Sequence, residues 1–554
     1  MPIRARPHLV HRIMATLVTL GGLFDLLDGL WMRHPLRLNP LAELLPLEVH
    51  QGSRALLVLS GVVLISLGRG LGRGKQRAWQ LALVVSSFSV LLHLVRNRHV
   101  IFILPPLILL VYLVVARRFF IAGSDPAGTR RSLTLAPVLF LSLLAYGTIG
   151  QFRLRSAISP PFELKRAIGA TLLAAVGADN LGVTPHTPHA REFLDSIAWF
   201  SIGATLLILW LLLRPVILRR LDPSLTMAQT IIRIFGDHSL AAFAVEPDKH
   251  HFLAASGHAT VAYRVTTGVA ITVGDPIGPP DKVEAAVDEF YAHCRRHDWI
   301  PCFYEIKAQG LEIYRQRKLR TLKIAEEAVI YLDQFSLRGT KMQKVRQALN
   351  KIEREHTDLN IEFFHGSPSQ DVEDQLQIIS GDWLSKKGIK ELGFTMGRFD
   401  PATLGHQFLA VAADKGKVLA FVSWRPYAGK GLTLDLMRYV PEAPKFIMDF
   451  LIAKSLLRLQ QEDYRQASLA NAPLANVSPE DELTMLDRGV RLLFENLHGI
   501  YEFKSLFQFK KKFNPTWEGR YLAFPSLETL PRIAVAMMRV HRLQPLERTL
   551  LYGS

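Results

Sequence analysis

An acid and a base interrupt one of the most apolar segments of this chain. Asp435 and Arg438 lie within GLTLDLMRY, residues 431–439, whose composition predicts a β-strand. A charged side chain in such a strand is either paired or functional, because burial of an unpaired charge is costly. A structural ion pair is therefore the alternative. Residues three apart point to opposite faces of an ideal strand, so both can reach one pocket only across a bend or bulge.

A second chemically unusual segment is YEFKSLFQFKKKFNPTWEGRYLAF, residues 501–524, which interleaves basic and aromatic residues. The alternation of Phe with Lys in its first half predicts a strand with one apolar and one cationic face. Such a face suits polyanions, among them RNA and lipid headgroups. The alternative is a basic edge strand that is protected against aggregation.

A strongly basic helix is expected over residues 337–354, where a single acid, Glu353, faces several cations. Its positive field would attract a nucleic-acid backbone or an anionic membrane. A run of charges can also be a solvated face. The net charge of +17 favours a polyanionic partner. The basic residues of the helix are Arg338, Lys341, Lys344, Arg346, Lys351 and Arg354.

The composition requires more than one structural part. With 554 residues, of which 49% are apolar and 21% charged, the chain is too long for one compact domain and too hydrophobic for an ordinary soluble one. A membrane-spanning helix needs about 20 mainly apolar residues. Further spans follow the first, which predicts that it is no signal peptide. The expected spans are residues 9–30, 55–71, 78–94, 100–116, 133–149 and 197–218.

Basic residues cluster before the first span and after the second, fourth and sixth, which are on alternate sides of the membrane. The amino terminus and the carboxy-terminal domain are therefore expected in the cytoplasm, although Arg96 and Arg98 weaken the contrast. The chain has two cysteines, Cys294 and Cys302, without metal-ligand spacing. They predict neither a disulfide framework nor a zinc site.

Two further features lie in the membrane region. Asp25 and Asp28 lie on one face of the first span, where carboxylates are costly unless they face a cavity or a partner. They could line a path for a polar headgroup, lie near the membrane edge, or pair with a basic group inside the bundle. Residues 162–176 predict an interfacial or re-entrant helix.

From Asp222 onward the pattern is mixed α/β. Residues 259–273 predict strands, GDPIGPP at 274–280 a tight loop, and residues 281–297 a helix. Farther on, 418–427 and 431–439 predict an antiparallel pair. A helix at 445–461 and a short strand at 467–475 follow.

Several of these motifs resemble one known family. LDLMRYVPEAPKFIMDFLI, SLANAPLA and the segment at 501–521 are similar to the synthase domain of the phosphatidylglycerol lysyltransferases, the aminoacyl-phosphatidylglycerol synthases of the multiple peptide resistance factor type. GDPIG and FSLRGTKMQKVRQALNKIER resemble the first half of that domain. The resemblance covers about residues 225–525, and the membrane region looks like a reduced version of the family's.

The apolar spans predict about six membrane helices, and the resemblance implies that two tandem acetyltransferase-like (GNAT-like) folds follow them, with the active site between these folds. We expect a membrane domain at 1–221, a first subdomain at 222–395 that carries the basic helix, a second at 396–530 that carries the catalytic motifs, and a tail at 531–554.

The resemblance also implies an aminoacyltransferase of the cell membrane. Such enzymes move an amino acid from aminoacyl-tRNA to the glycerol hydroxyl of phosphatidylglycerol, which gives a cationic lipid and resistance to antimicrobial peptides. Lysyl transfer is expected first, with alanyl or arginyl as alternatives. The ester exchange needs no metal and no cofactor. The implied partners are aminoacyl-tRNA, phosphatidylglycerol and the anionic membrane, and a homo-oligomer remains open.

Candidate residues follow from matching motifs. Asp435 would bind the substrate ammonium or help activate the hydroxyl, and Arg438 would hold a phosphate or the oxyanion. Lys504 is the next catalytic candidate. The expected substrate contacts are Glu305, Asn471, Asp275 and Gly278, of which the last two could simply form a turn. The expected tRNA contacts are Lys341, Lys344, Arg346, Lys510, Lys511 and Lys512.

Two other functions compete with this prediction. An acetyltransferase-like fold could use acyl-CoA, but neither VSWRPYAGKG nor RQRKLRTLK supplies the glycine-rich phosphate loop that such an enzyme would show. The other alternative is a non-enzymatic module, anchored in the membrane, that binds RNA or lipid.

Overall fold

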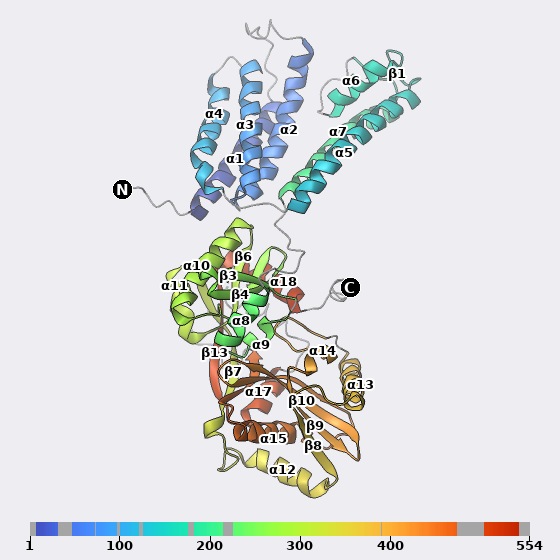
Figure 1. Ribbon diagram of the computed structural model, residues 1–554. Helices are drawn as coiled ribbons and strands as arrows, with labels where there is room; N and C mark the ends of the chain where they lie inside the picture. The colour runs from blue at the N-terminus through green and yellow to red at the C-terminus, as the bar shows by residue number, and fades with distance from the viewer. Residues whose placement is uncertain are drawn as a thin grey trace, which may run out of the picture. The chain divides into compact units, whose positions relative to one another are not determined.

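The computed structural model (Figure 1) describes residues 7–31, 47–72, 74–96, 100–120, 126–175, 182–213, 225–246, 248–388, 391–473 and 503–541. The chain forms two compact units. One holds residues up to 217, and the other holds nearly all residues from 218 onward.

The described part of the first unit is helical. Five of its helices, α1, α3, α4, α5 and α7, contain or begin a segment that is long and apolar enough to cross a membrane. The helices are α1 (Pro7–Trp31), α2 (Leu47–Gly72), α3 (Gln76–Arg96), α4 (Val100–Val115), α5 (Pro126–Arg153), α6 (Leu164–Ala175) and α7 (Pro188–Leu213).

The predicted multi-span region is thereby confirmed for five of its six expected helices. The remaining one, expected at 55–71, lies on the long helix α2, whose apolar stretch Leu56–Gly72 is shorter than the others. At most 33% of the residues in each spanning segment are buried within the protein. The outward faces are therefore apolar, as contact with lipid requires.

Helices α1 and α2 pack closely at a pair of glycines. A Cβ atom on Gly22 would lie 2.7 Å from the carbonyl oxygen of Gly61, and one on Gly61 would lie 2.5 Å from that of Gly22. Small residues of this kind let helix backbones approach each other in a membrane. The two glycines therefore fix where these helices cross.

The intramembrane carboxylates pair inside the bundle. Asp25 accepts hydrogen bonds from Ser60 of α2 (2.7 Å) and Ser89 of α3 (2.9 Å), and His93 Nε2 lies 3.1 Å from the same carboxylate. The other ring nitrogen of His93 lies 3.7 Å from Asp28. Of the alternatives for Asp25 and Asp28, the structure supports pairing with a basic group in the bundle.

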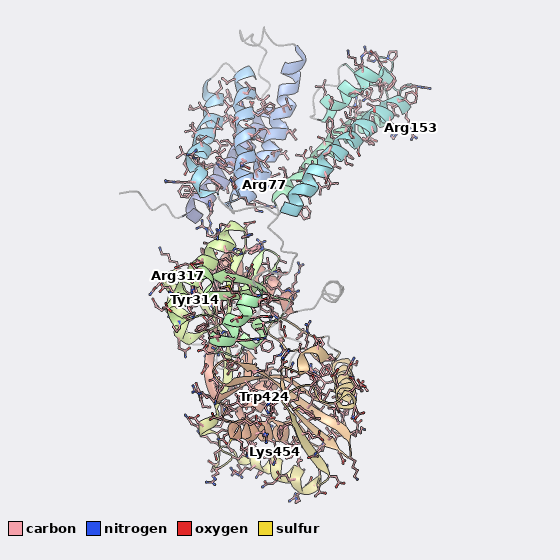
Figure 2. The ribbon with its side chains drawn as sticks, viewed as in Figure 1. Arg77, Arg153, Tyr314, Arg317, Trp424 and Lys454 are labelled. Atoms are coloured by element: carbon pink, nitrogen blue, oxygen red, sulfur yellow. The ribbon has the colours of Figure 1, made fainter. Side chains whose placement is uncertain are left out.

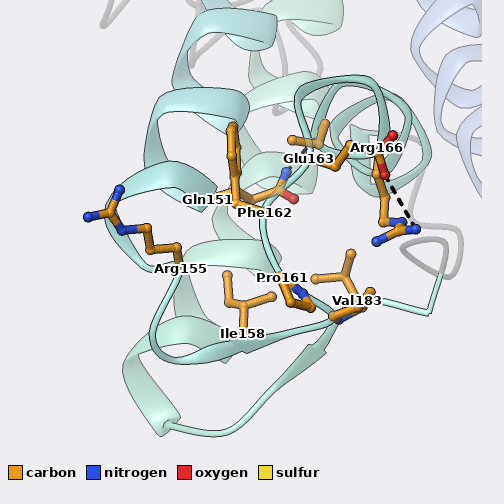
Figure 3. A pocket seen from close by; sticks show the side chains of 10 residues that line it. Gln151, Arg155, Ile158, Pro161, Phe162, Glu163, Arg166 and Val183 are labelled. Atoms are coloured by element: carbon orange, nitrogen blue, oxygen red, sulfur yellow. Dashed lines mark hydrogen bonds and ion pairs between the residues drawn. The ribbon is translucent and has the colours of Figure 1, made fainter.

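The helix expected at 162–176 is α6, which packs against α5 and α7. Gln151 of α5 donates hydrogen bonds to Thr171 Oγ1 (3.0 Å) and to the carbonyl oxygen of Ala167 (3.1 Å). A pocket of about 20 Å³ lies beside these residues (Figure 3). It has room for about one water molecule, so it is too small for a substrate.

The second unit contains a mixed sheet. Its strands are β3 (His250–Ala254), β4 (Ala259–Thr266), β5 (Val269–Thr272), β6 (Ile300–Lys307), β7 (Arg320–Tyr331), β8 (Leu359–Phe364), β9 (Phe408–Asp414), β10 (Lys417–Tyr427), β11 (Gly431–Tyr439), β12 (Gln466–Pro473) and β13 (Thr516–Phe524). Its helices are α8 (Leu225–Phe235), α9 (Ala241–Ala244), α10 (Pro280–Arg296), α11 (Leu311–Gln316), α12 (Gln343–Glu355), α13 (Gln370–Lys387), α14 (Pro401–Leu404), α15 (Ile447–Gln461), α17 (Phe503–Lys511) and α18 (Leu530–His541).

The described strands form one sheet of eleven in the order β3-β4-β5-β6-β13-β7-β12-β11-β10-β9-β8. Neighbours are antiparallel except for two parallel pairs, β5 with β6 and β11 with β12. Helix α10 connects the first parallel pair and α15 the second, as parallel strands require a crossover. An antiparallel run followed by a strand–helix–strand unit therefore occurs twice, and the predicted tandem of acetyltransferase-like folds is confirmed.

One strand of the first half comes from the end of the chain. Strand β13 follows the second half in the chain, yet it lies antiparallel between β6 and β7 of the first half (Figure 1). Helix α18 buries Ile533, Met537 and Val540 in the core that contains Val269 and Ile271 of β5. Strand β13 lies in the segment expected at 396–530, and most of α18 lies in the segment expected at 531–554. Both elements pack with the first half.

Two element predictions were wrong in part. FKSLFQFKK forms the helix α17 rather than a strand. Its inward residues follow a helical spacing, since Lys510 is buried and Leu506 and Phe507 are half-buried, while Gln508 is exposed. The basic helix α12 begins at Gln343 instead of 337.

Candidate active site

A β-bulge positions the predicted acid and base. Strand β11 pairs with β10, and a register shift leaves Asp435 and Leu436 opposite the single residue Ser423. The backbone N–H of Leu436 donates a hydrogen bond to Ser423 Oγ (3.2 Å). The bulge breaks the strand's alternation, and the Arg438 guanidinium acts electrostatically on the Asp435 carboxylate. The bend that the sequence required is present.

Asp435 is one end of a buried chain of charges. Arg425 Nε donates to Asp435 Oδ2 at 2.5 Å, and Arg425 Nη1 donates to Glu246 Oε1 at 2.8 Å. Lys249 Nζ donates to the other oxygen of Glu246 at 2.7 Å. A Cβ atom on Gly397 would lie 1.6 Å from Asp435 Oδ1, so glycine is required beside the carboxylate.

Two effects shift the pKa of the Asp435 carboxyl group in opposite directions. Burial raises the pKa of its carboxyl group, and the charge and hydrogen bond of Arg425 lower it. Among the described residues, Asp435 Oδ1 has no hydrogen-bond partner. An unpaired buried acceptor oxygen of this kind is costly and is a candidate for a functional role.

Arg438 is held by a different set of residues. Its guanidinium lies over the ring of Trp383, 4.0 Å from the ring centroid, and its Nη2 lies 3.7 Å from Glu391 Oε2. Burial raises the pKa of Glu391, and Arg438 opposes this shift. Trp383 and Glu391 therefore fix the position of the cation.

Glu305 lies on β6, where the sheet of the first half meets β13. It is a buried glutamate with a φ of +60°, a backbone conformation that is unfavourable for a side chain of this kind. Burial raises the pKa of its carboxyl group to about 7, although hydrogen bonds with Tyr304 and Asn471 oppose the shift. Strain and a shifted pKa in one residue are typical of functional sites.

Lys510 lies in the interior rather than on an RNA-binding surface. It is 3% exposed, and its Nζ donates to the carbonyl oxygen of Asn471 at 2.8 Å. Burial lowers the pKa of its ammonium group to about 7, against the attraction of Glu327 and Glu305. The tRNA contact predicted for Lys510 stays a prediction, and the helix turns this side chain inward in the free protein.

Two contacts connect the cluster at Glu305 to that at Asp435. The Phe394 ring centroid lies 6.2 Å from that of Tyr304 and 5.7 Å from Lys249 Nζ. Because Tyr304 precedes Glu305 and Lys249 binds Glu246, the buried ring of Phe394 lies between the two polar clusters.

An ion pair stabilises the sheet within this region. Arg520 of β13 pairs with Glu327 of β7, which also accepts a hydrogen bond from Ser468 of β12. Burial alone would raise the pKa of Glu327, but the charge of Arg520 and the hydrogen bonds from Ser239, Ser468 and Arg520 together lower it. The ion pair and the hydrogen bond together link the neighbouring strands β13, β7 and β12.

Asp275 and Gly278 have structural contacts. Asp275 accepts hydrogen bonds from the N–H of Lys307 (2.8 Å) and from Tyr314 OH (2.8 Å), and Tyr314 is labelled in Figure 2. Burial raises the pKa of the Asp275 carboxyl group. A Cβ on Gly278 would lie 2.7 Å from that of Ala259. Both contacts agree with the turn that was the alternative for these residues.

The other basic candidates divide into three groups. Lys341, Lys344 and Lys511 are exposed. Arg346 Nη1 donates to the carbonyl oxygens of Leu337 and Gly339, and Lys512 pairs with Asp449, so these two are engaged within the fold. The side chain of Lys504 lies outside the described residues, although its backbone is part of α17.

Sequence reasoning missed Glu246, Trp383, Glu391 and Arg425. Arg425 had a signal, since it lies in the strand predicted to pair with that of Asp435, where a cross-strand ion pair is expected. The other three come from segments distant in the chain. Within the described ranges, no group of three His, Cys, Asp or Glu side chains could hold a metal ion.

A groove of about 480 Å³ lies elsewhere on the second unit. The end of β7, the loop before α12 and the residues between α17 and β13 form its walls. Arg338 and Lys341 line it, and the described residues that line it include no carboxylate, although Glu518 accepts a hydrogen bond from the lining residue Tyr331.

The chain thus combines apolar helices long enough to cross a membrane with a second unit in which buried acids and bases lie between two like α/β folds. The family described as "Phosphatidylglycerol lysyltransferase, C-terminal" matches residues 229–524. The chain belongs to this family.

Relatives agree with the assignment. A phosphatidylglycerol lysyltransferase of Staphylococcus epidermidis is 31% identical over 322 residues, which cover 57% of this chain and 38% of that protein. An uncharacterized protein of Corynebacterium glutamicum is 28% identical over 513 residues, which cover 86% of this chain and 63% of the relative. The chain therefore spans less than half of the Staphylococcus enzyme.

Two solved structures share the fold of the second unit. L-PGS from Bacillus licheniformis has a TM-score of 0.52 and 27% identity, and covers 59% of this chain and 98% of its own. The C-terminal domain of a putative lysylphosphatidylglycerol synthetase from Agrobacterium fabrum has a TM-score of 0.51 and 28% identity, with 57% and 96% coverage.

Proposed function

We propose that this protein transfers an aminoacyl group from aminoacyl-tRNA to the glycerol hydroxyl of phosphatidylglycerol. The observation that carries the proposal is the buried set of acids and bases around Asp435 and Arg438, in a chain of the phosphatidylglycerol lysyltransferase family. The family membership indicates the reaction, and the site supplies groups suited to it.

Asp435 is the proposed contact for the substrate ammonium. Its Oδ1 is buried and has no partner among the described residues, so it can accept a hydrogen bond from the α-ammonium of the aminoacyl group. Lysyl is the first choice for the amino acid, because matched relatives are phosphatidylglycerol lysyltransferases. Alanyl and arginyl remain the alternatives.

Arg438 is the proposed contact for the lipid phosphate or for the oxyanion. The lipid hydroxyl attacks the ester carbonyl, a new carbon–oxygen bond forms, and the ester bond to the ribose breaks. Negative charge develops on the carbonyl oxygen as this occurs, and a fixed guanidinium stabilises it. Trp383 and Glu391 hold the guanidinium in place before substrate arrives.

Glu305 and Lys510 are the proposed proton carriers. The proton that leaves the lipid hydroxyl must reach the departing ribose oxygen. Groups with a pKa of about 7 can both accept and release a proton near neutral pH. Asn471 lies between them, because it bonds to Glu305 through its side chain and to Lys510 through its carbonyl oxygen.

Mass spectrometry of lipids tests the function. Cells that express this chain should contain a new aminoacylated phosphatidylglycerol, and Asp435→Ala and Arg438→Ala should abolish it while folded protein remains in the membrane. Lys351→Ala is a matched control on the exposed end of α12 and should leave the product unchanged. Near-normal product in both site variants would contradict the assignment, and a product that needs acyl-CoA would favour the acyltransferase alternative.

A further inference from the structure

Arg425 of β10 and Asp435 of β11 form an ion pair that makes only one of its two available hydrogen bonds. Arg425 Nε donates to Asp435 Oδ2 at 2.5 Å. An arginine and a carboxylate frequently make two parallel bonds, and the second would join Arg425 Nη2 to Asp435 Oδ1. Across the part of the chain that the structure describes, neither of these atoms has a hydrogen-bond partner, although both are buried. A donor and an acceptor are therefore left unused within one ion pair.

The Arg425 guanidinium is held in place by contacts on its other sides. Its Nη1 donates to Glu246 Oε1 at 2.8 Å, and the other oxygen of Glu246 accepts a hydrogen bond from Lys249. The guanidinium also lies over the ring of Phe243 in α9, 5.0 Å from the ring centroid. These contacts fix the direction of the Nη2 donor before any substrate binds.

The unused oxygen of Asp435 is fixed as well. The bulge in β11 sets the position of the side chain, and the backbone at Gly397 approaches Oδ1 so closely that a Cβ atom there would lie 1.6 Å away. Buried polar atoms without partners are costly, and native proteins have few of them. A fixed donor and a fixed acceptor in the same ion pair therefore indicate a ligand that carries a matching acceptor and donor.

An α-aminoacyl ester has this combination of groups. Its α-ammonium is a donor that suits a carboxylate oxygen, and its carbonyl oxygen is an acceptor that suits a guanidinium. Both groups are attached to the same carbon atom, so they can reach two neighbouring side chains of the protein together.

We propose that Arg425 Nη2 donates a hydrogen bond to the ester carbonyl oxygen of the aminoacyl group while Asp435 Oδ1 accepts one from its α-ammonium. This contact rests on the proposed function and adds Arg425 to the catalytic residues. As the lipid hydroxyl oxygen bonds to the carbonyl carbon, negative charge develops on the carbonyl oxygen and the bond from Arg425 strengthens. The ester bond to the ribose then breaks, and the proton of the lipid hydroxyl ends on the ribose oxygen. Arg425 keeps its own protons throughout.

The two arginines of the site then have separate roles. Arg425 serves the carbonyl oxygen, and Arg438, beside Trp383 and Glu391, serves the lipid phosphate. The atoms that Arg425 and Asp435 contact are present in every aminoacyl group. The pair therefore does not distinguish lysyl from alanyl or arginyl, and the choice of amino acid must come from other residues.

Binding of small aminoacyl analogues tests the contact on the full chain in detergent, without tRNA or lipid substrate. L-alaninamide carries both the ammonium and the carbonyl group, isopropylamine lacks the carbonyl, and N-acetyl-L-alaninamide lacks the ammonium. Wild-type protein should bind L-alaninamide at least about tenfold more tightly than either of the others, as expected for the loss of a hydrogen bond to a charged group. Isothermal titration calorimetry measures the three affinities.

Two variants assign the carbonyl contact to Arg425. Arg425→Lys keeps a positive charge beside Asp435 and removes the Nη2 donor. It should weaken L-alaninamide at least about tenfold and leave isopropylamine nearly unchanged, whereas a merely structural role would weaken both alike. Phe243→Leu removes the ring beneath the guanidinium and should also weaken mainly L-alaninamide. Arg458→Lys is the matched control, because Arg458 pairs with a glutamate on the surface of α15. Thermal unfolding checks that each variant is folded.

Transfer in nanodiscs that contain phosphatidylglycerol gives a second readout. With lysyl-tRNA as donor, Arg425→Lys should lower kcat at least about 100-fold, as the loss of an oxyanion donor does. The KM for lysyl-tRNA should change much less, because the contact becomes strong only as charge develops on the carbonyl oxygen.

Different results bear on the contact and on the reaction. Binding that needs the carbonyl group and is lost in Arg425→Lys supports the contact, even if wild-type protein makes no aminoacyl lipid. Equal affinity of the wild type for L-alaninamide and isopropylamine, no binding of either, or equal losses in Arg425→Lys would overturn it, even if the lipid forms. A near-normal kcat in Arg425→Lys would overturn it too. If Arg425→Lys does not fold, the wild-type series and Phe243→Leu decide.

Discussion

Glu305 has two unfavourable features that the fold must compensate. A non-glycine residue at φ +60° costs about 1 kcal/mol, and burial disfavours its charged form. Lys510 has the opposite charge and the same problem of burial. Neither residue stands out as buried in the sequence, because the strand and the helix that enclose them are far apart in the chain.

The pH dependence of stability should report both groups separately. The folded pKa of Glu305 is about 7 and lies above its ordinary value of 4.5, so the folded state binds more protons and stability falls as pH rises between these values. The folded pKa of Lys510 is about 7 and lies below its ordinary 10.5, so stability rises from pH 7 toward 10.5. Glu305→Gln should remove the fall and Lys510→Met the rise.

Thermal unfolding of the purified chain between pH 4.5 and 10.5 measures this. Lys511→Met is the control for Lys510, because Lys511 is the exposed neighbour on the same helix. Parallel pH profiles for Lys510→Met and the wild type would show that Lys510 is not held in a neutral form.

At the scale of elements, the bulge in β11 determines where the charges lie. The composition of GLTLDLMRY predicted the strand, and the spacing of Asp435 and Arg438 predicted that a regular strand would separate them. The partner that forms the bulge, Ser423, could not be identified, because the register between two strands depends on packing across the whole sheet. The helix α17 was predicted as a strand for a related reason, since its Phe and Lys residues fit both periods.

Ser423→Ala should destabilise the bulge. The substitution leaves the buried N–H of Leu436 without its acceptor, at a cost of about 1–3 kcal/mol. Lipid product should fall because Asp435 and Arg438 shift, while RNA binding stays unchanged. Denaturant unfolding and the lipid assay measure the two effects. Ser385→Ala, on the exposed side of α13, is the control; a loss of product equal to that in Ser423→Ala would contradict the mechanism.

At the scale of the whole molecule, charge and hydrophobicity are separated along the chain. The five helices that are long and apolar enough to cross a membrane lie before residue 217, and the candidate active-site residues lie after it. This division was predictable, because composition over long windows does not depend on packing details. The position of β13 between β6 and β7 was not predictable, because the order of the sequence gives no sign that a late strand joins an early part of the sheet.

Membrane orientation is testable with a tag. The basic loops predict that the carboxy terminus is cytoplasmic, so a carboxy-terminal epitope should resist protease in intact cells and be cleaved after permeabilisation. An epitope between α1 and α2 should show the opposite behaviour. Cleavage of the carboxy-terminal tag in intact cells would show that the carboxy terminus lies outside the cell, which would contradict the predicted orientation.

The position of β13 between β6 and β7 also constrains how the protein is made. The first half cannot close its sheet until the last strand has left the ribosome, about 200 residues after β6 has emerged. During that interval β6 and β7 lack the strand that separates them. The nascent chain therefore exposes two unpaired strand edges for as long as the second half is being synthesised, and a premature stop near residue 510 leaves the first half, rather than the second, without its central strand.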